Sequence, residues 1–233
     1  MLARRLQAEL MDDPAIDAGE HRRALAGLAR INALSRAGAS VWSGVHDLLR
    51  GHGQATLLDV AVGSGDVLVD VVRRAGRAGV ELAPQACDIS AEALTATAER
   101  AAATGVRVVC HRSDVVRGGI PLADGGVDVV MCSLFLHHLE ERNVVGLLRE
   151  MARVARVGVI VSDLVRCWRG VVAAGVAGRV LTRSPVVRVD AVRSVQGAFT
   201  VDEVRAMAAA AGMSGARVAP SWPMRMLLTW RRT

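Results

Sequence analysis

The chain of 233 residues is 52% hydrophobic and 22% charged, which is typical of a globular protein and excludes an extensively disordered one. It contains no run of 18 or more uncharged apolar residues, so no transmembrane segment is expected. The formal net charge is +6, and all 29 basic residues are arginines. These arginines are scattered, with no block of five or more, so no nucleic-acid partner is expected.

The first fifty residues are predicted to be helical. Two apolar stripes at helical spacing carry this prediction: Leu25, Leu28, Ile31 and Leu34, then Val41, Trp42, Val45, Leu48 and Leu49. Glycines at positions 51 and 53 follow. We therefore assign residues 1–52 to an N-terminal helical cap and residues 53–233 to one further domain.

Strand and helix patterns alternate from residue 56 onward. The predicted strands are the apolar runs Thr56–Val62, Val80–Ile89, Val106–Cys110, Val127–Leu134 and Val157–Leu164. The predicted helices between them are Val67–Arg77, Ala91–Ala103 and Glu140–Ala155. Such alternation is typical of βαβ units, and it predicts a parallel sheet in an α/β fold.

The last third of the chain has a different pattern. Residues 166–198 form an inserted segment whose apolar part, Trp168–Leu181, is predicted to act as a helical lid. Thr200 and Glu203 have the spacing of a capping box, which predicts a helix at Val201–Ala211. Two short apolar runs, Ala216–Ala219 and Met224–Trp230, predict a final antiparallel hairpin.

The cysteines and the first residues bear on the cellular compartment. No CxxC pair is present, and all four cysteines lie in apolar stretches: Cys87, Cys110, Cys132 and Cys167. We therefore expect buried free thiols in a reducing environment. The N-terminal residues soon include acids and lack the apolar stretch of a secretory signal. These features predict a cytoplasmic protein.

A glycine-containing turn joins the first predicted strand to the next helix. Gly63 and Gly65 would let the backbone turn tightly and approach a ligand, although an ordinary βα turn can have the same pattern. No Gly-Lys-Ser/Thr follows, which excludes a nucleoside-triphosphate P-loop. Leu68 stands where the dinucleotide fingerprint has its third glycine, so a pyrophosphate ligand is disfavoured.

Carboxylates follow the next two predicted strands. Asp88 could accept both hydroxyls of a ribose; its alternative role, a helix N-cap, is better served by Ser90. Asp114 could accept a hydrogen bond from an adenine amino group, with Ile89 packing on the ring; the alternative is a solvated loop acid. Because ligands in open α/β sheets bind outside the carboxyl ends of the strands, these positions together predict an adenosyl site.

The ordered motifs resemble those of class I S-adenosylmethionine-dependent methyltransferases over about residues 55–165. The residues that carry this resemblance are Asp59-Val-Ala-Val-Gly-Ser-Gly65, Asp88, Ser113-Asp114 and Val127-Asp-Val-Val-Met-Cys-Ser-Leu-Phe-Leu-His-His138. Within that superfamily the chain is similar to the ubiquinone/menaquinone-biosynthesis type and to methyltransferases associated with type III polyketide synthases. That likeness rests on Ser133–His138, Ala198–Glu203, Ala211-Gly212 and Trp222-Pro-Met-Arg225.

The resemblance implies a fold, a cofactor and its contacts. The implied fold is a doubly wound, seven-stranded, mostly parallel sheet whose last hairpin supplies the antiparallel strand. The implied cofactor is S-adenosylmethionine, and no metal is implied. The implied cofactor-binding residues are Asp59, Ala61, Gly63 and Gly65 near the methionine end, Asp88 at the ribose, Ile89, Asp114 and Val115 at the adenine, and Cys132 and Ser133 beside the sulfonium. Ala61 replaces the family's first motif glycine and narrows this space by a methyl group.

Candidate catalytic and acceptor-binding residues lie after the fourth and fifth strands. His137 or His138 could act as a general base, the alternative being a helix cap and a packed core side chain. Asp163 and Arg166 could orient a phenol or carboxyl group, the alternative being a loop ion pair. The valines at 171, 172, 176 and 180, with Trp168, suit an apolar acceptor or a membrane-surface contact, or else a core-covering or homodimer face.

The sequence therefore predicts O- or C-methylation of a small aromatic, phenolic or lipid-like acceptor. An RNA or protein methyltransferase is the alternative, but Ser133-Leu-Phe-Leu stands where an Asn-Pro-Pro-type motif would be. A cofactor-binding regulatory protein without catalysis is also compatible with Ala61.

Overall fold

The computed structural model describes residues 2–10, 16, 17, 19, 23, 27, 30, 31, 36–182 and 184–233. In chain order its elements are α2 (Ala37–Leu48), β1 (Gln54–Val60), α3 (Asp66–Arg77), β2 (Glu81–Asp88), α4 (Ala91–Ala102), β3 (Val109–Arg112), β4 (Val127–Ser133), the 3-10 helix η2 (Leu136–His138), α5 (Glu141–Val154), β5 (Ala155–Leu164), α6 (Trp168–Leu181), α7 (Pro185–Gly197), α8 (Val201–Ala210), β6 (Arg217–Ser221) and β7 (Arg225–Arg231).

The strands form one seven-stranded sheet with the order β3-β2-β1-β4-β5-β7-β6. Strands β1 to β5 pair in parallel, whereas β7 runs antiparallel to both β5 and β6. This arrangement confirms the predicted fold class, including the antiparallel strand supplied by the last hairpin. It also brings the carboxyl ends of the parallel strands to one edge of the sheet.

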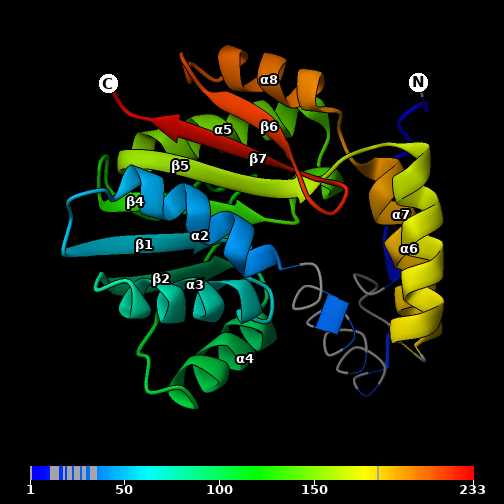
Figure 1. Cartoon of the computed structure of the whole chain (residues 1–233), viewed down its shortest axis with the longest axis horizontal. Coiled ribbons are helices and arrows are strands. Elements are labelled where there is room, and N and C mark those ends of the chain that lie inside the picture. The colour runs from blue at the N-terminus through cyan, green and yellow to red at the C-terminus, as the bar shows by residue number, and fades with distance from the viewer. Residues whose placement is uncertain are drawn as a thin grey trace.

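Helices cover both faces of the sheet, so the central strands are apolar on both sides (Figure 1). In β4, residues 127–132 are all buried, as expected for a strand between two helical layers. Helices α2, α3 and α4 pack with one core cluster, and α5 and α8 pack with the other. The paired helices α6 and α7 stand beyond the ends of the strands (Figure 1).

Local signals place the helix starts where the sequence predicts them. Thr200 and Glu203 form the capping box of α8, and the Ser90 hydroxyl accepts a hydrogen bond from the backbone N–H of Ala93 at the start of α4. The Ser184 and Pro185 residues mark the start of a further helix after α6. Ser184 caps α7 and Pro185 occupies its first turn, where the missing N–H removes no helical bond, and α7 was not predicted.

Three predictions need correction or fall outside the described residues. Strand β3 begins at Val109 rather than Val106. Only two of the four thiols lie in the core. Cys110 is exposed because β3 is a short edge strand, and Cys167, the residue before α6, is half-buried. Of the first helical stripe, Leu25, Leu28 and Leu34 lie outside the described residues, while Ile31 packs near α7. Of the second stripe, Val41, Val45 and Leu48 are buried on α2, Trp42 is half-buried there, and Leu49 is buried just after the helix.

Within the described part of the chain, we find no helix with the length and apolar character needed to cross a bilayer.

Candidate active site

In the glycine loop after β1, every second residue from 61 to 65 has a left-handed backbone conformation. The φ angles are 56° at Ala61, 56° at Gly63 and 70° at Gly65. A Cβ at Gly65 would lie 2.7 Å from the side chain of Thr97, so packing as well as φ requires glycine there. A Cβ at Gly63 would have no atom within 4 Å, which leaves open space beside that residue. Ala61 adopts the left-handed conformation despite its Cβ, which strains the loop by about 1 kcal/mol.

The Asp88 carboxylate holds this loop in place. Its Oδ2 accepts a hydrogen bond from the Gly63 N–H at 3.0 Å, and its Oδ1 accepts one from the Ser90 N–H at 2.9 Å. The end of β3 is tied to the same residue, because the Ser113 N–H donates to the Asp88 carbonyl oxygen at 3.0 Å. Each carboxylate oxygen can accept a further hydrogen bond, so both remain able to receive the hydroxyls of a ribose.

The residues predicted to contact an adenine lie beside Asp88 but have different surroundings. Ile89 is exposed, so an apolar surface is available next to the loop. Asp114 Oδ1 accepts hydrogen bonds from the backbone N–H groups of Val116 and Arg117, which is the turn role that the sequence left open. The side chain of Val115 packs in the core.

Asp59 is a buried acid near the end of β1. Its Oδ1 has no hydrogen-bond partner among the described residues. Burial raises the pKa of this carboxyl well above its ordinary value, and the neighbouring Asp66 and Asp88 raise it further. Such an orphaned oxygen, with the open space beside Gly63, fits a ligand that brings hydrogen-bond donors to this loop.

A cavity of about 510 Å³ opens next to the glycine loop. Its wall includes the loop, the end of β4, the facing sides of α6 and α7, the turn between β6 and β7, and Glu9 from the N-terminal segment. Four predicted site residues line it: Ala61, Gly63, Ser133 and His137. Its volume lies within the range of small-molecule sites. Asp88, Ile89 and Asp114 are not part of this wall, so the cavity continues from the methionine side of the predicted cofactor site.

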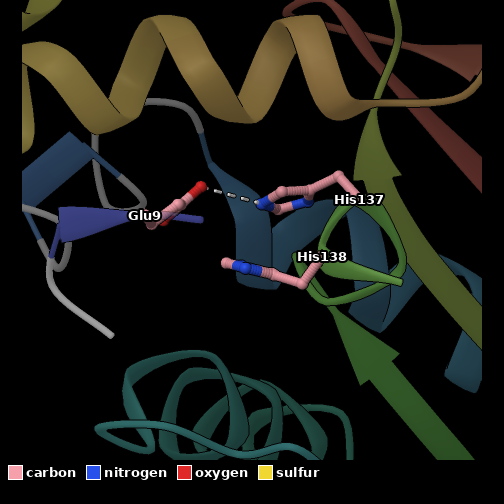
Figure 2. A group of neighbouring side chains, drawn as sticks. All are labelled: Glu9, His137 and His138. Carbon is pink, nitrogen blue, oxygen red and sulfur yellow. Dashed lines mark ion pairs between the residues drawn. The ribbon is translucent and has the colours of Figure 1, made fainter. Parts of the chain in front are cut away.

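His137 is the centre of a buried hydrogen-bonded cluster. Its Nδ1 lies 2.7 Å from Asp163 Oδ1, and its Nε2 lies 3.7 Å from Glu9 Oε1. Asp163 also accepts hydrogen bonds from the backbone N–H groups of Leu136 and Leu164, at 2.7 and 2.6 Å. Figure 2 shows the rings of His137 and His138 extending from η2 toward Glu9.

The charge of His137 is set by its two carboxylate neighbours. Burial by itself disfavours the imidazolium, but Asp163 and then Glu9 raise the pKa of His137 to about 9. Burial likewise opposes the ionised form of Asp163, yet His137 lowers the pKa of Asp163 below its ordinary value. The cluster therefore holds a buried imidazolium between carboxylates at neutral pH.

An N-terminal strap, residues 2–10, brings Glu9 to His137. The Arg5 N–H donates to the Gln196 carbonyl oxygen at 3.0 Å, and the Leu10 N–H donates to Asp190 Oδ1 at 2.8 Å. The Ser194 hydroxyl donates to Glu9 Oε1. Sequence reasoning missed Glu9 because nothing in the local pattern of a strap indicates which distant side chain it will meet.

Several predicted site residues have roles other than lining the cavity. The Arg166 guanidinium pairs with Glu203 at 2.6 Å and donates to the carbonyl oxygens of Leu2 and Ala198, so it joins structural elements rather than facing an acceptor. Trp168 is exposed on the outer side of α6. The side chain of Cys132 lies in the core, where burial raises the thiol pKa. Arg166 therefore agrees with the ion-pair alternative, and the side chains of Trp168 and Cys132 are not part of the cavity wall.

The valines of α6 are not among the residues that line the cavity, so of the alternatives open from the sequence, acceptor binding is the one they do not fit. The cavity is lined by the small residues Gly170, Ala173, Ala174 and Ala177, whereas Val172, Val176 and Val180 are exposed. The sequence missed this division because α6 is apolar on nearly every side.

One group of residues could hold a divalent cation. Glu9, His137 and His138 each offer a ligand atom, and these atoms lie within 4.8 Å of one another. Asp163 bonded to Nδ1 of His137 is the kind of partner that orients a metal-binding imidazole.

Residues 57–158 match the protein-family model described as "Methyltransferase domain". This part of the chain is similar to a methyltransferase domain. The match, together with the predicted seven-stranded and mostly parallel sheet, confirms the predicted enzyme class, an S-adenosylmethionine-dependent methyltransferase, and with it the predicted cofactor. Among curated proteins, no sequence match was found.

Solved structures share the fold at low sequence identity. A SAM dependent methyltransferase from Aquifex aeolicus is 19% identical with a TM-score of 0.60, over 90% of this chain and 97% of that one. The plantazolicin methyltransferase in complex with SAH is 10% identical with a TM-score of 0.68, over 95% and 92%. The magnesium protoporphyrin IX methyltransferase from Synechocystis with bound SAH is 14% identical with a TM-score of 0.58, over 95% and 90%. Plantazolicin and magnesium protoporphyrin IX are different acceptors, so the shared fold does not select one.

The pKa of His137 gives a pH-dependent prediction. Because folding raises this pKa from 6.5 to about 9, the stability it contributes is complete below about pH 6.5 and is lost as the pH rises through 9. NMR titration should place His137 near 9, and Asp163→Asn should lower that value, while Asp202→Asn on the exposed side of α8 should not. The free energy of unfolding should fall between pH 7 and pH 10. A wild-type His137 that titrates near 6.5 would contradict the cluster.

The left-handed Ala61 gives a second prediction. Ala61→Gly removes the Cβ that opposes this conformation, so the free energy of unfolding should rise by about 1 kcal/mol. Urea denaturation measures the change. Ala78→Gly, at a position with φ −90°, is the matched control and should not stabilise the chain. Equal destabilisation by both substitutions would show that position 61 is not strained.

Proposed function

We propose that the chain transfers a methyl group from S-adenosylmethionine to a small aromatic, phenolic or lipid-like acceptor held in the cavity. The observation that carries this proposal is the position of His137, paired with the buried Asp163, in the wall of a cavity that begins at the glycine loop. The described lining of the cavity is mostly apolar and contains no block of basic residues, which favours a small acceptor over RNA or protein. Whether the methyl group is added to oxygen or to carbon is left to the experiment below.

The small residues of α6 support an apolar acceptor. Gly170, Ala173, Ala174 and Ala177 leave room that larger side chains would fill, and Val195 and Leu164 add apolar surface. Pockets that bind small molecules are mostly apolar with a few placed polar groups, here His137, Glu9 and Arg225. A flat ring or an alkyl chain with one hydroxyl group suits such a wall.

The described residues fit the cofactor. Gly63 and Gly65 would let the backbone approach its methionine end, and Asp88 would accept the ribose hydroxyls. Asp59 would supply a carboxyl at the loop, Ile89, Asp114 and Val115 would form the adenine side, and the backbone of Cys132 with Ser133 would border the transferred group. When bound, the cofactor supplies a methyl group already activated by its sulfonium leaving group.

His137 would act on the acceptor as the general base. Its Nδ1 is held by Asp163, so Nε2 is the atom available to receive a proton from an acceptor hydroxyl. The imidazole must be neutral to do so, and its raised pKa means that only a fraction is neutral at pH 7. We therefore expect turnover to rise with pH toward about 9. Asp163 would be a positioning residue, which fixes the ring and its tautomer.

The finer family placement is part of this proposal. We propose membership of the ubiquinone/menaquinone-biosynthesis type and a relation to enzymes associated with type III polyketide synthases on the likeness of the sequence motifs, and the residues that carry this likeness lie at or near the site. Glu203 caps α8 and holds Arg166, and the Trp222–Arg225 segment lines the cavity. The strap and the α6–α7 pair would then be the acceptor-specific additions to the domain.

Cofactor binding is tested at Asp88. Asp88→Ala should weaken the binding of S-adenosylhomocysteine by about 1–3 kcal/mol, because ribose hydroxyls and the Gly63 N–H lose their acceptor. Isothermal titration calorimetry gives the affinity. Asp202→Ala removes an exposed carboxyl from α8 and should bind as the wild type does. Unchanged affinity in Asp88→Ala would remove this residue from the cofactor site.

Methyl transfer is tested with a panel of phenols, alkylresorcinols and quinols, with product position read by mass spectrometry and NMR. On the best acceptor, His137→Gln should lower kcat by about 10²–10⁴-fold with little change in cofactor affinity, and should remove the rise of turnover toward pH 9. Turnover that survives a chelator would separate base catalysis from a metal held by Glu9, His137 and His138. Full activity of His137→Gln would refute the base assignment.

A further inference from the structure

The outer side of α6 carries an apolar stripe in contact with solvent. Trp168, Val172, Val176 and Val180 repeat every four residues, and each is 57% to 74% exposed. At about 100° per residue these side chains share one side of the helix, while the residues that line the cavity are on another. Nothing in the described part of the chain covers this stripe.

A second exposed apolar group adjoins the start of α6. Trp222 and Met224, on the turn between β6 and β7, are both exposed. Sγ of Cys167 lies 4.0 Å from Sδ of Met224, so this turn lies against the N-terminal end of α6. Both turn residues also line the cavity, so the exposed apolar surface meets the cavity wall.

The segment of the sequence that contains α6 holds most of the net charge of the chain. Residues 166–198 contain six arginines and one aspartate, a net charge of +5, whereas the other 200 residues contain 23 arginines and 22 acids, a net charge of +1. Arg169 and Arg179 are exposed and fall on the same side of α6 as the stripe, near its two ends. The Arg169 guanidinium lies 5.5 Å from the ring of Trp168. Thus nearly all of the net charge is carried by the segment that exposes the stripe.

We infer that the outer side of α6 is a docking surface for an anionic lipid membrane. A helix side with valines, a tryptophan and flanking arginines matches the interface of a bilayer, where apolar side chains enter the acyl region and arginines meet anionic headgroups. The positive charge disfavours a second copy of the chain as the occupant, because two such surfaces would repel each other. Docking would place the cavity wall formed by Trp222 and Met224 beside the bilayer, from which an apolar acceptor could enter.

This inference concerns the surface of α6, and it does not require the acceptor assigned above. The test is co-sedimentation of the full chain with phosphatidylcholine vesicles and with vesicles of phosphatidylcholine and phosphatidylglycerol at three to one. The chain should bind the anionic vesicles and not the neutral ones. Binding should decrease when the salt concentration is raised, because headgroup attraction is screened.

Two pairs of variants locate the contact. Val172→Asp with Val176→Asp should lower vesicle binding at least about tenfold, because charges replace the inserted apolar groups. Val109→Asp, at a valine that is 58% exposed on the edge strand β3, should not. Arg169→Gln with Arg179→Gln should lower binding about tenfold, whereas Arg73→Gln with Arg77→Gln on the exposed side of α3 removes the same net charge and should have less effect.

Opposite results would overturn the docking surface. One such result is that the wild-type chain does not bind anionic vesicles at low salt. Another is that the α6 variants and their control variants lose vesicle binding to the same extent. A wild-type dimer that the valine variants convert to a monomer, without vesicle binding, would assign the stripe to a second copy instead. S-adenosylhomocysteine affinity by calorimetry should be unchanged in all these variants. If the wild-type chain does not bind S-adenosylhomocysteine, that result counts against the proposed function but does not affect the vesicle-binding result.

Discussion

The buried contact between Asp163 and His137 joins the parts of the molecule that build the site. Asp163 lies in the buried stretch of β5, one residue before its end, and removing a carboxylate from water is unfavourable unless donors surround it. It receives two backbone N–H groups and the His137 ring, so the end of β5 and η2 are fixed to each other. The imidazolium then attracts Glu9, which holds the N-terminal strap across the cavity. The attraction between His137 and Glu9 therefore helps to place the N-terminal strap in the wall of the cavity.

The cofactor side depends on backbone geometry instead of charge. Three left-handed residues in five turn the chain sharply after β1, and the Asp88 carboxylate fixes the middle of that turn through the Gly63 N–H. The first of these residues is alanine, which shows that the turn is maintained by its surroundings against a local preference. The two sides meet at the cavity, where Ala61 and His137 are both in the wall.

Helix α6, whose sequence is mostly apolar, has one side in the wall of the cavity and another exposed to solvent. Small residues face the cavity, where they leave space, and valines face outward, where they lie among arginines. The binding of an apolar acceptor and the docking at an anionic membrane would thus use opposite sides of one helix. The two sides of α6 share no residue, whereas Trp222 and Met224 belong both to the exposed apolar surface and to the cavity wall.

The sequence by itself determined the sheet, the helices on its faces, the glycine loop, and the roles proposed for Asp88 and His137. The strands, helices and glycine loop follow from local periodicity, from turn residues and from the rule that parallel strands end at one edge, whereas the complete seven-stranded sheet and the role of His137 are implied by the resemblance to methyltransferases. Tertiary structure decided the rest. It placed Glu9 beside His137, paired Arg166 with Glu203, and put the valines of α6 on its outer side rather than on its cavity side. Each of these depends on contacts between residues far apart in the chain, or on which side of an almost uniformly apolar helix is covered, and no local pattern contains that information.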